Sequence, residues 1–337
     1  MSSLESFILG KDADERGKVL TLYFHYPCFD GLVSSVLASE LLAKEKRWNA
    51  IRFSPVSYDD RKNWSSRRLE PPFAIVDFLY HPKACFWADH HITTFASEQL
   101  KSRFGQHHDE SRMLFDAQAL SCASLLWGRF ARFLDARYSE MVFWADKIDS
   151  AKYASVQEAL FGDTPALRIN ASLMLKSDLE YCRLLIQELR SKKLSRVAAL
   201  PNVQERYEEV RCRREAGLKR MRERVRFEDG DIVTFDISAA ENEVVSRYAP
   251  YYFFEQARYS VGVVRLDDKI RITAMRNPWL NFESIPLGKI FNRFGGGGHQ
   301  RVASVILPVE ESERVPEIVE EVKLEIRNQP TAERVVA

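Results

Sequence analysis

Three short apolar runs, each followed at once by a side chain able to bind a metal ion, constrain the fold of this chain most. They are Val19–Phe24 before His25, Phe73–Val76 before Asp77, and Ala84–Ala88 before Asp89-His90-His91. Short apolar runs of this kind predict buried strands. Parallel α/β sheets place their ligand sites at the carboxyl ends of such strands. Aspartate and histidine at three strand ends therefore predict a hydrolytic metal centre.

The first half of the chain has the pattern of an α/β sheet. After the first predicted strand, Asp30-Gly31 opens a stretch with apolar residues at helical spacing, Leu32 to Leu42. Strand, polar turn and helix in this order form the first half of a parallel βα unit. A further strand is predicted around Ile51–Phe53, and mainly helix from about 117 to 134 and from 156 to 200. We therefore expect an N-terminal domain with a mostly parallel sheet.

The second half predicts a smaller α/β domain with a mixed sheet. Its expected elements are a strand at 231–237, an antiparallel hairpin of 259–264 and 270–275, a helix at 285–294 and a strand at 302–307. Between the halves, 206–226 carries nine Lys/Arg and four Glu beside a rough apolar stripe. It is either an amphipathic linking helix with a solvated basic face or a basic wall facing an anionic substrate. The predicted domains are 1–195, a helical basic linker 196–229, and 230–337.

Composition excludes several classes of protein. A content of 45% hydrophobic and 29% charged residues is that of a globular chain, and a net charge of +1 indicates no partner by itself. The five cysteines are scattered without zinc-binding spacing, which favours reduced thiols in a cytoplasmic protein. Neither a membrane span nor the pattern of a signal peptide is visible, so we expect no membrane partner.

A run of four glycines, Gly295–Gly298, precedes His299 between the last predicted helix and strand. Glycine allows close backbone approach to a ligand, and exposed amides can hold a phosphate, although a glycine run can also be a linker. Arg276, near the end of a hairpin strand, is a second candidate anion contact or else a surface arginine. The predicted substrate-binding residues are Arg276, Gly296, Gly297, Gly298 and His299.

The segment from Met141 to Ile148 brings two further carboxylates, Asp146 and Asp149. Either of them can supply one more metal ligand beyond those at the strand ends. A single aspartate after a strand is often only a turn residue or a helix cap. Several of them together with His25 and His91 favour the metal centre.

Taken together, Asp89-His90-His91 and Gly295–His299 resemble the two hallmarks of the DHH phosphoesterase superfamily with its associated C-terminal domain. That superfamily includes RecJ exonucleases, nano-RNases, exopolyphosphatases, adenosine-bisphosphate phosphatases and cyclic-dinucleotide phosphodiesterases. The order and separation of the motifs match, and the resemblance covers roughly residues 19–310.

The resemblance implies a centre of two divalent ions, most often Mn²⁺, with Mg²⁺ or Co²⁺ as alternatives. It implies that Asp77 bridges the ions and that His91 orients this carboxylate or the substrate. The implied metal ligands are His25, Cys28, Asp30, Asp77, His90 and Asp146. A small residue, Ala145, precedes Asp146 as in relatives, but Asp149 is close behind. Arg276 and His299 are implied to grip the substrate phosphate.

One position departs from the family pattern. The usual Asp-x-Asp-Gly is here Cys28-Phe29-Asp30-Gly31, so a thiol stands where an aspartate ligand is expected. A thiolate is a poor ligand for a hard ion such as Mn²⁺. Cysteine at this position therefore puts the affinity and the identity of one ion in doubt.

The expected function is metal-dependent hydrolysis of phosphodiester bonds in short oligonucleotides or nucleotides, with Asp77 and His91 as catalytic residues. A phosphomonoesterase or exopolyphosphatase with the same centre is one alternative. A catalytically weak nucleotide-binding protein, crippled at Cys28, is another. Relatives are often dimers, which leaves a homodimer open.

Overall fold

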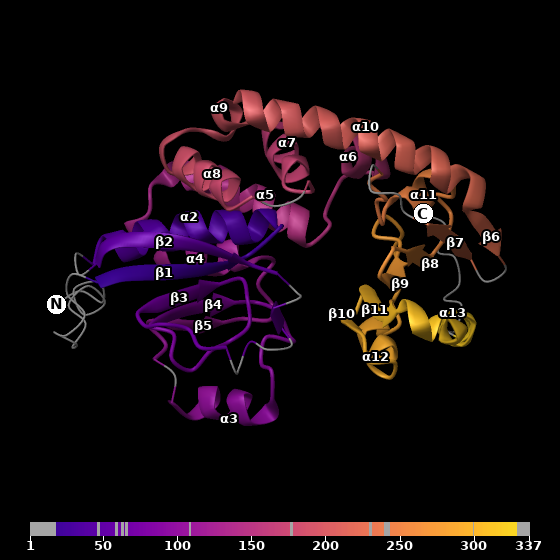
Figure 1. Cartoon of the computed structure of the whole chain (residues 1–337), viewed down its shortest axis with the longest axis horizontal. Helices are drawn as coiled ribbons and strands as arrows, with labels where there is room; N and C mark the ends of the chain where they lie inside the picture. The colour runs from indigo at the N-terminus through magenta and orange to yellow at the C-terminus, as the bar shows by residue number, and fades with distance from the viewer. Residues whose placement is uncertain are drawn as a thin grey trace. The chain divides into compact units, whose positions relative to one another are not determined.

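The chain divides into two compact units, which are described here one at a time (Figure 1). The computed structural model describes residues 18–45, 48–57, 60–61, 64, 67–107, 109–175, 178–228, 231–238, 243–298 and 300–328. The first unit comprises Met1–Lys152 with Asp163–Tyr207, and the second comprises Tyr153–Gly162 with Glu208–Ala337. The last change from one unit to the other falls inside helix α10 (Pro201–Arg224). The domain bounds predicted from the sequence stay a prediction.

The first unit is built on a five-stranded sheet in the order β2-β1-β3-β4-β5, and every neighbouring pair in it is parallel. Its strands are β1 (Lys18–His25), β2 (Trp48–Val56), β3 (Phe73–Val76), β4 (Phe86–Asp89) and β5 (Met113–Phe115). Its helices are α2 (Phe29–Ala43), α3 (Glu98–His107), α4 (Cys122–Phe130), α5 (Ser139–Asp149), α7 (Pro165–Ser172), α8 (Leu179–Ser191) and α9 (Leu194–Ala198), with short 3-10 turns at Ala131–Phe133 and Ala136–Tyr138. The predicted mostly parallel α/β sheet is confirmed.

Strands β3 and β4 are buried on both faces, which explains why they are almost continuously apolar. Alternate residues such as Leu22, Val76 and Ala88 join a core that helices α2, α4, α5 and α8 complete. The residues between them, such as Ile75 and Trp87, join a second core with an aromatic content, to which α3 contributes Phe104. Figure 1 shows α2 along one face of the sheet and α3 beyond the other.

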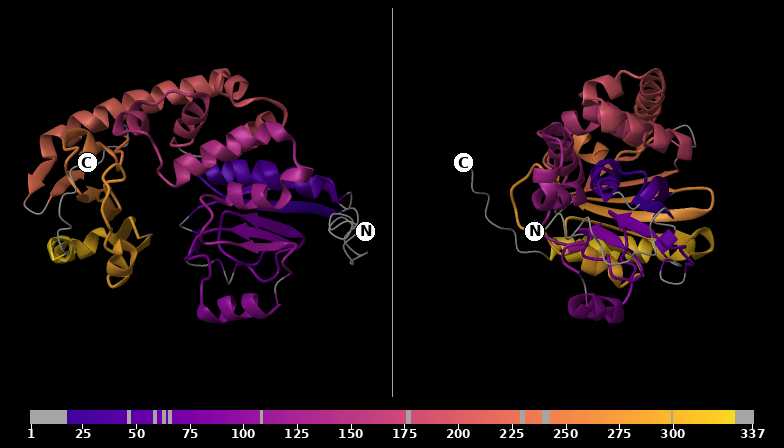
Figure 2. Two further views of the ribbon diagram at one scale, coloured as in Figure 1. Left: turned by 180° about the vertical axis from the view of Figure 1, so that it is seen from behind. Right: turned by 90° about the vertical axis from the view of Figure 1, so that its left-hand side faces the viewer.

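The second unit holds a six-stranded sheet in the order β10-β11-β9-β8-β7-β6. Only β7 and β8 are parallel, so the predicted mixed sheet and its hairpin are confirmed. Its elements are α6 (Val156–Phe161), β6 (Arg226–Glu228), β7 (Ile232–Ser238), α11 (Ala249–Phe253), β8 (Tyr259–Arg265), β9 (Lys269–Arg276), α12 (Leu287–Asn292), β10 (Gly297–Gly298), β11 (Val302–Pro308), a 3-10 segment Val309–Arg314, and α13 (Val315–Arg327). Apolar residues of α12 and α13 pack on one face of this sheet, and Figure 2 shows the same elements from behind and from the side.

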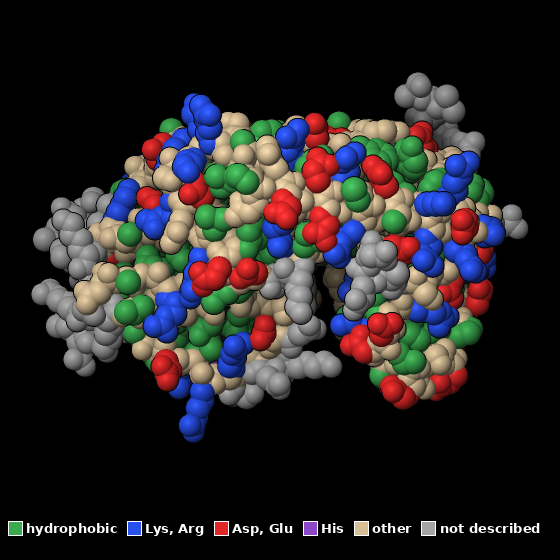
Figure 3. Space-filling model, turned by 45° about the horizontal axis from the view of Figure 1, so that its top comes forward, with side chains coloured by type: hydrophobic (Ala, Val, Ile, Leu, Met, Phe, Trp, Pro, Cys, Tyr) green, Lys and Arg blue, Asp and Glu red, His purple; other side chains and the backbone are tan. Residues whose placement is uncertain are grey.

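Several charged residues on α10 form ion pairs, within the helix or with Glu243. Arg211 lies 2.8 Å from Glu208 and 3.5 Å from Glu215, while Arg220 lies 2.6 Å from Glu243. Figure 3 shows Lys/Arg and Asp/Glu side chains interspersed on the face it presents. This pattern favours the linking helix with a solvated charged face over the basic wall. None of the helices within the described ranges is long and apolar enough to cross a membrane.

Candidate metal centre

The strand order brings the predicted ligands to one edge of the first sheet. After β1 the chain forms β2 on one side and then returns to form β3 on the other, so the order of strands reverses between β1 and β3. Ligand sites of open α/β sheets form at such a reversal, outside the carboxyl ends of the strands. His25 is the last residue of β1, Asp77 directly follows β3, and Asp89 ends β4.

Helix α2 begins so close to this edge that its first turn needs a glycine. Cys28 is the N-cap residue of α2, and Asp30 lies in its first turn. A Cβ atom on Gly31 would lie 2.1 Å from the carbonyl oxygen of His25 and 3.2 Å from Asp77 Oδ2. The Asp30-Gly31 pair therefore allows the carboxylate of Asp30 to enter the centre while the backbone of α2 passes close to His25.

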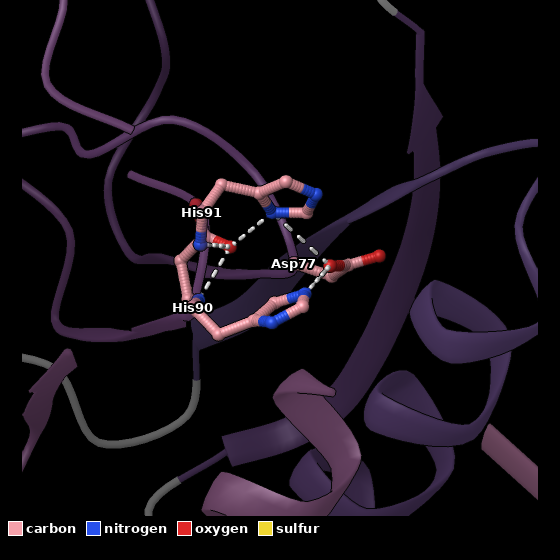
Figure 4. Close-up of side chains that lie close together, drawn as sticks. Asp77, His90 and His91 are labelled. Atoms are coloured by element: carbon pink, nitrogen blue, oxygen red, sulfur yellow. Dashed lines mark hydrogen bonds and ion pairs between the residues drawn. The ribbon is translucent and has the colours of Figure 1, made fainter. Parts of the chain in front are cut away.

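The carboxylate of Asp77 lies close to His25, His90 and His91, of which Figure 4 shows the last two. Its Oδ2 is 3.4 Å from His25 Nδ1, and its Oδ1 is 3.8 Å from His90 Nε2 and 3.7 Å from His91 Nδ1. Both oxygens are buried, and neither accepts a hydrogen bond from the part of the chain that the structure describes. Leaving such a group unsatisfied costs free energy, so Asp77 has the environment of a ligand whose partner is a cation.

Three overlapping groups of side chains have ligand atoms within 4.8 Å of one another. They are His25 with Cys28 and Asp77, Asp30 with His90 and Asp149, and Asp77 with Asp89, His90 and His91. All belong to the first unit. Carboxylate oxygen and imidazole nitrogen suit divalent ions such as Mn²⁺, Mg²⁺ and Co²⁺, so the residues fit the metal that the sequence predicts.

Asp89 differs from the other carboxylates because its oxygens are already engaged. Its Oδ1 accepts hydrogen bonds from the backbone N–H of His90 at 2.8 Å and of His91 at 3.3 Å, and lies 2.8 Å from His91 Nδ1. Its Oδ2 accepts a short hydrogen bond from Thr94 Oγ1. Asp89 therefore serves to hold the loop and to orient the ring of His91.

This pairing sets the protonation of both partners. Burial opposes the charge on His91, but the ion pair and hydrogen bond with Asp89 outweigh it and raise the pKa of His91 to about 9. Burial likewise opposes the charge on Asp89, yet the same contacts with His91 and Thr94 lower the pKa of Asp89. In the metal-free protein His91 is thus an imidazolium held by a carboxylate.

Burial and neighbouring charges also shift the pKa values of Asp77, Cys28 and His25. Burial, and then the neighbouring Asp30 and Asp89, raise the pKa of Asp77 well above its usual range. Burial and then Asp77 raise the pKa of the Cys28 thiol in the same way. Burial, followed by the charge of His91, lowers the pKa of His25 to about 4. His25 is therefore neutral at physiological pH, and a neutral imidazole is the form that binds a metal ion.

The two carboxylates of α5 occupy different places. Asp149 Oδ2 lies 3.4 Å from His90 Nε2, and Asp30 Oδ2 lies 3.7 Å from the same nitrogen. Asp146, the residue predicted as a ligand, instead accepts a hydrogen bond from Ser121 Oγ at 2.5 Å and is in none of the three groups. The structure therefore brings Asp149 to His90 and leaves Asp146 at the side of the centre.

A small pocket opens beside these residues. Its lining includes His25, Asp77, Asp89 and His91, and also two residues that the sequence did not single out, Arg61 and Thr93. Arg61 donates a hydrogen bond from Nη2 to the carbonyl of Thr93 at 3.0 Å. The guanidinium group therefore lies next to the loop that follows Asp89-His90-His91, where a cation can attract a phosphate.

The predicted phosphate-binding residues lie in the second unit. Arg276 is buried, and its guanidinium donates to the carbonyls of Asn277 at 3.1 Å, Leu280 at 2.8 Å and Phe282 at 2.6 Å. Burial, followed by Arg301, lowers the pKa of Arg276. Gly296 directly precedes β10, Gly297 and Gly298 form β10 and pair with β11, and His299 lies outside the described residues.

Sequence reasoning missed the supporting residues of the centre more than the centre itself. Nothing in the local sequence marks Arg61 or the contact between Ser121 and Asp146, because both depend on distant segments. The closeness of Asp89 and His91 in the sequence was an available signal for their pairing, because carboxylates commonly orient the histidines of metal sites.

Similarity to known proteins is found among solved structures and concerns the fold. No protein-family model matches the sequence, and no curated protein sequence matches it. A pGpG-specific phosphodiesterase, PggH, from Vibrio cholerae is similar in structure, with 18% identity, a TM-score of 0.65, and coverage of 91% of this chain and 99% of that one. RecJ from Thermus thermophilus is also similar: its Mn²⁺ complex has 15% identity, a TM-score of 0.56 and coverage of 93% and 53%. Its Mg²⁺ complex has 16% identity, a TM-score of 0.51 and coverage of 93% and 50%, so this chain spans about half the length of that RecJ.

Each of these likenesses extends over more than nine tenths of this chain. At these identities the likeness concerns the fold. The edge at which β1, β3 and β4 present His25, Asp77 and His90 is the place where the Asp89-His90-His91 motif predicts the site. The chain therefore shares the fold of PggH and of RecJ.

Proposed function

We propose that the chain is a metal-dependent phosphoesterase that hydrolyses phosphodiester bonds in short oligonucleotides or nucleotides. The observation that carries the proposal is the buried carboxylate of Asp77, whose two oxygens face different ligand groups and accept no hydrogen bond within the described ranges. A carboxylate in this position is suited to bridge two cations. The fold shared with a phosphodiesterase and with RecJ supports the reaction class.

Two ions fit the arrangement of ligand atoms. His25 and Cys28 lie with Asp77 on one side, and Asp30, His90 and Asp149 lie on the other. Asp149 takes the place that the sequence offered first to Asp146. Bound divalent ions supply an activated water at neutral pH and neutralise charge on the phosphoryl oxygens. Mn²⁺ and Mg²⁺, each present in a RecJ structure, are the first ions to test.

The protein's own groups would hold and orient the phosphate. Asp89 keeps the ring of His91 turned into the pocket, where a protonated imidazole can donate a hydrogen bond to a phosphoryl oxygen. Arg61 lines the same pocket and supplies a second positive charge suited to a phosphate oxygen. We further propose that Gly296–Gly298 offer backbone amides to the substrate, and that Arg276 acts mainly by bracing the loop from Asn277 to Phe282.

Cys28 supports a second candidate, a nucleotide-binding protein with weak catalysis. Its thiol is a member of one ligand group, but burial and Asp77 raise its pKa, so it stays neutral without metal. A neutral thiol is a poor ligand for Mn²⁺. We therefore expect the protein to bind one ion strongly and the ion next to Cys28 weakly.

The decisive experiment compares hydrolysis of labelled dinucleotides, pGpG among them, with that of adenosine bisphosphate and polyphosphate in the presence of Mn²⁺. Release of mononucleotides is the expected result. Cleavage of polyphosphate alone would establish the exopolyphosphatase instead. No cleavage of any substrate, with fewer than two bound ions, would establish the weak binding protein.

Asp77→Asn tests the centre itself. The change preserves shape but removes a bridging charge, so we expect Mn²⁺ binding to be lost and turnover to fall by about a hundred-fold or more. The metal-free variant should be at least as stable as the natural protein, because a crowded buried carboxylate is gone. Unchanged turnover would refute the proposed centre.

A further inference from the structure

One short segment, Ala119–Ala123, contacts His90, Asp30 and Asp146. The carbonyl of Ala119 lies 3.1 Å from His90 Nδ1. The backbone N–H groups of Cys122 and Ala123 donate to the two carboxylate oxygens of Asp30 at 2.7 and 2.8 Å. Ser121 Oγ donates to Asp146 Oδ1 at 2.5 Å. These bonds join β4, α2 and α5 to the start of α4.

We infer that Ala119–Ala123 is the element that positions Asp30, His90 and Asp149 as one metal-binding group, and that Asp146 is a positioning residue instead of a ligand. The inference rests on the proposed metal centre. The segment makes three hydrogen-bonded contacts, with His90, Asp30 and Asp146, and each contact orients a proposed ligand in a different way.

The contact with His90 selects the imidazole tautomer whose Nε2 can bind a metal ion. When Nδ1–H donates to the carbonyl of Ala119, the electron pair is on Nε2. Nε2 is buried, has no hydrogen-bond partner within the described residues, and faces Asp30, Asp77 and Asp149. Metal-binding histidines are commonly fixed by a backbone carbonyl in this manner.

The contact with Asp30 holds a carboxylate at the first turn of α4. Two backbone N–H groups and Ser34 Oγ donate to it, so both of its oxygens have a fixed direction. Free N–H groups at a helix start favour a negative charge. Asp30 is thereby oriented before any ion arrives.

The contact with Asp146 affects Asp149, the third proposed ligand, because both residues lie on α5. Asp146 and Asp149 are three residues apart on the last turn of α5 and therefore on the same face of the helix. Ser121, which is fully buried, also accepts a hydrogen bond from Ser124 N at 2.9 Å, which fixes its own side chain. A fixed Ser121 that holds Asp146 sets the rotation of this last turn, and with it the direction of Asp149.

Three variants separate a ligand from a positioning residue. Asp146→Asn keeps an oxygen that can accept the hydrogen bond of Ser121 but removes the charge, Asp146→Ala removes both, and Asp149→Asn changes the proposed ligand. Glu140→Gln, an exposed acidic residue in the first turn of the same helix, is the matched control. The readouts are Mn²⁺ affinity by calorimetry, the Mn²⁺-induced rise in melting temperature, and KM and kcat on a dinucleotide.

We expect Asp146→Ala to weaken Mn²⁺ binding by about 10- to 100-fold, the usual effect of losing a group that orients a ligand. Asp146→Asn should restore affinity close to that of the natural protein, whereas Asp149→Asn should not. An Asp146→Asn variant as weak as Asp149→Asn would make Asp146 a ligand and overturn the inference. An Asp146→Ala variant with natural affinity would overturn it as well.

The design distinguishes this inference from the proposed function. If the natural protein binds Mn²⁺ but cleaves none of the substrates, the affinity comparison still decides the role of Asp146. If the natural protein binds no Mn²⁺, both fail together. Circular dichroism of each metal-free variant checks that it is folded, and the Asp146→Asn variant supports the comparison should Asp146→Ala not fold.

Discussion

At the scale of residues, Cys28 is where the ligand set departs from oxygen and nitrogen donors. Its thiol shares a ligand group with His25 and Asp77, and its charge would be disfavoured by burial and by Asp77 and Asp149. Replacing it with aspartate supplies a hard ligand but also adds a negative charge to a crowded site. Cys28→Asp should therefore strengthen Mn²⁺ binding and lower the melting temperature of the metal-free protein.

Calorimetric titration with Mn²⁺, together with melting curves in a chelator, measures both effects. Cys212→Asp, at an exposed cysteine on α10, is the control for adding a carboxylate elsewhere. Equal Mn²⁺ affinity in the natural protein and in Cys28→Asp would mean that this position does not contact an ion.

Residue-level chemistry also marks the limit of what the sequence could predict. His25, Asp30, Asp77 and His90 were predicted as ligands because each follows or opens a strongly patterned element. Asp146 and Asp149 could not be separated in this way, since they lie three residues apart on one helix face. What separates them is a hydrogen bond from Ser121, which comes from a distant segment and leaves no local trace.

At the scale of elements, the last glycine of β10 is needed for its close pairing with β11. Gly298 has a φ of +146°, and a Cβ atom there would lie 2.4 Å from the carbonyl oxygen of Val302. Gly297 has open space around the same position. Gly298→Ala should lower the free energy of unfolding of the second unit by about 1–3 kcal/mol, whereas Gly297→Ala should change it little. Urea denaturation of the two variants makes the comparison, and equal losses would contradict it.

The attachment of α13 to β6 has a pH dependence of predictable sign. Glu228 Oε2 lies 2.6 Å from Lys323 Nζ and 3.3 Å from Arg327 Nη2. Burial opposes the charge of Glu228, but its bonds to Lys323 and Thr234 prevail and lower its pKa. A carboxylate whose pKa is lower in the folded state stabilises the fold above the unfolded-state pKa of about 4.5 and loses that effect as pH falls through the folded-state value.

Glu228→Gln should therefore be less stable than the natural protein at pH 7, and the two should converge as the pH falls below about 4.5. Melting temperatures of both proteins measured from pH 7 to pH 3 provide the comparison. A constant difference across this range would mean that the charge of Glu228 does not contribute.

Most strands were predicted from their apolar patterns, whereas the strands of only three residues were missed. β1, β7, β8, β9 and β11 match their predicted ranges within a residue or two because each alternates or continues over six residues or more. β5 and β6 have three residues each, which is too few for a pattern, and their place in a sheet comes from pairing with a neighbour. Short edge strands of this kind become strands through tertiary contacts.

At the scale of the whole molecule, the chain has two units with separate cores, and every candidate metal ligand belongs to the first. An ion that binds only the folded state stabilises that state by mass action, by about 2.7 kcal/mol at a concentration one hundred times the dissociation constant. Because the ligands are confined to one unit, this stabilisation should act on the unfolding of that unit alone.

Scanning calorimetry should therefore show two transitions, of which Mn²⁺ raises only one and a chelator restores it. Gly298→Ala identifies the other transition, because its substitution lies in the second unit and should lower that melting temperature alone. Asp149→Asn should reduce the Mn²⁺-induced shift while leaving the second transition in place. If Mn²⁺ raised both transitions equally, or raised the one that Gly298→Ala lowers, the ions would not be bound by the first unit alone. A metal centre confined to β1, β3, β4, α2 and α5 would then be refuted.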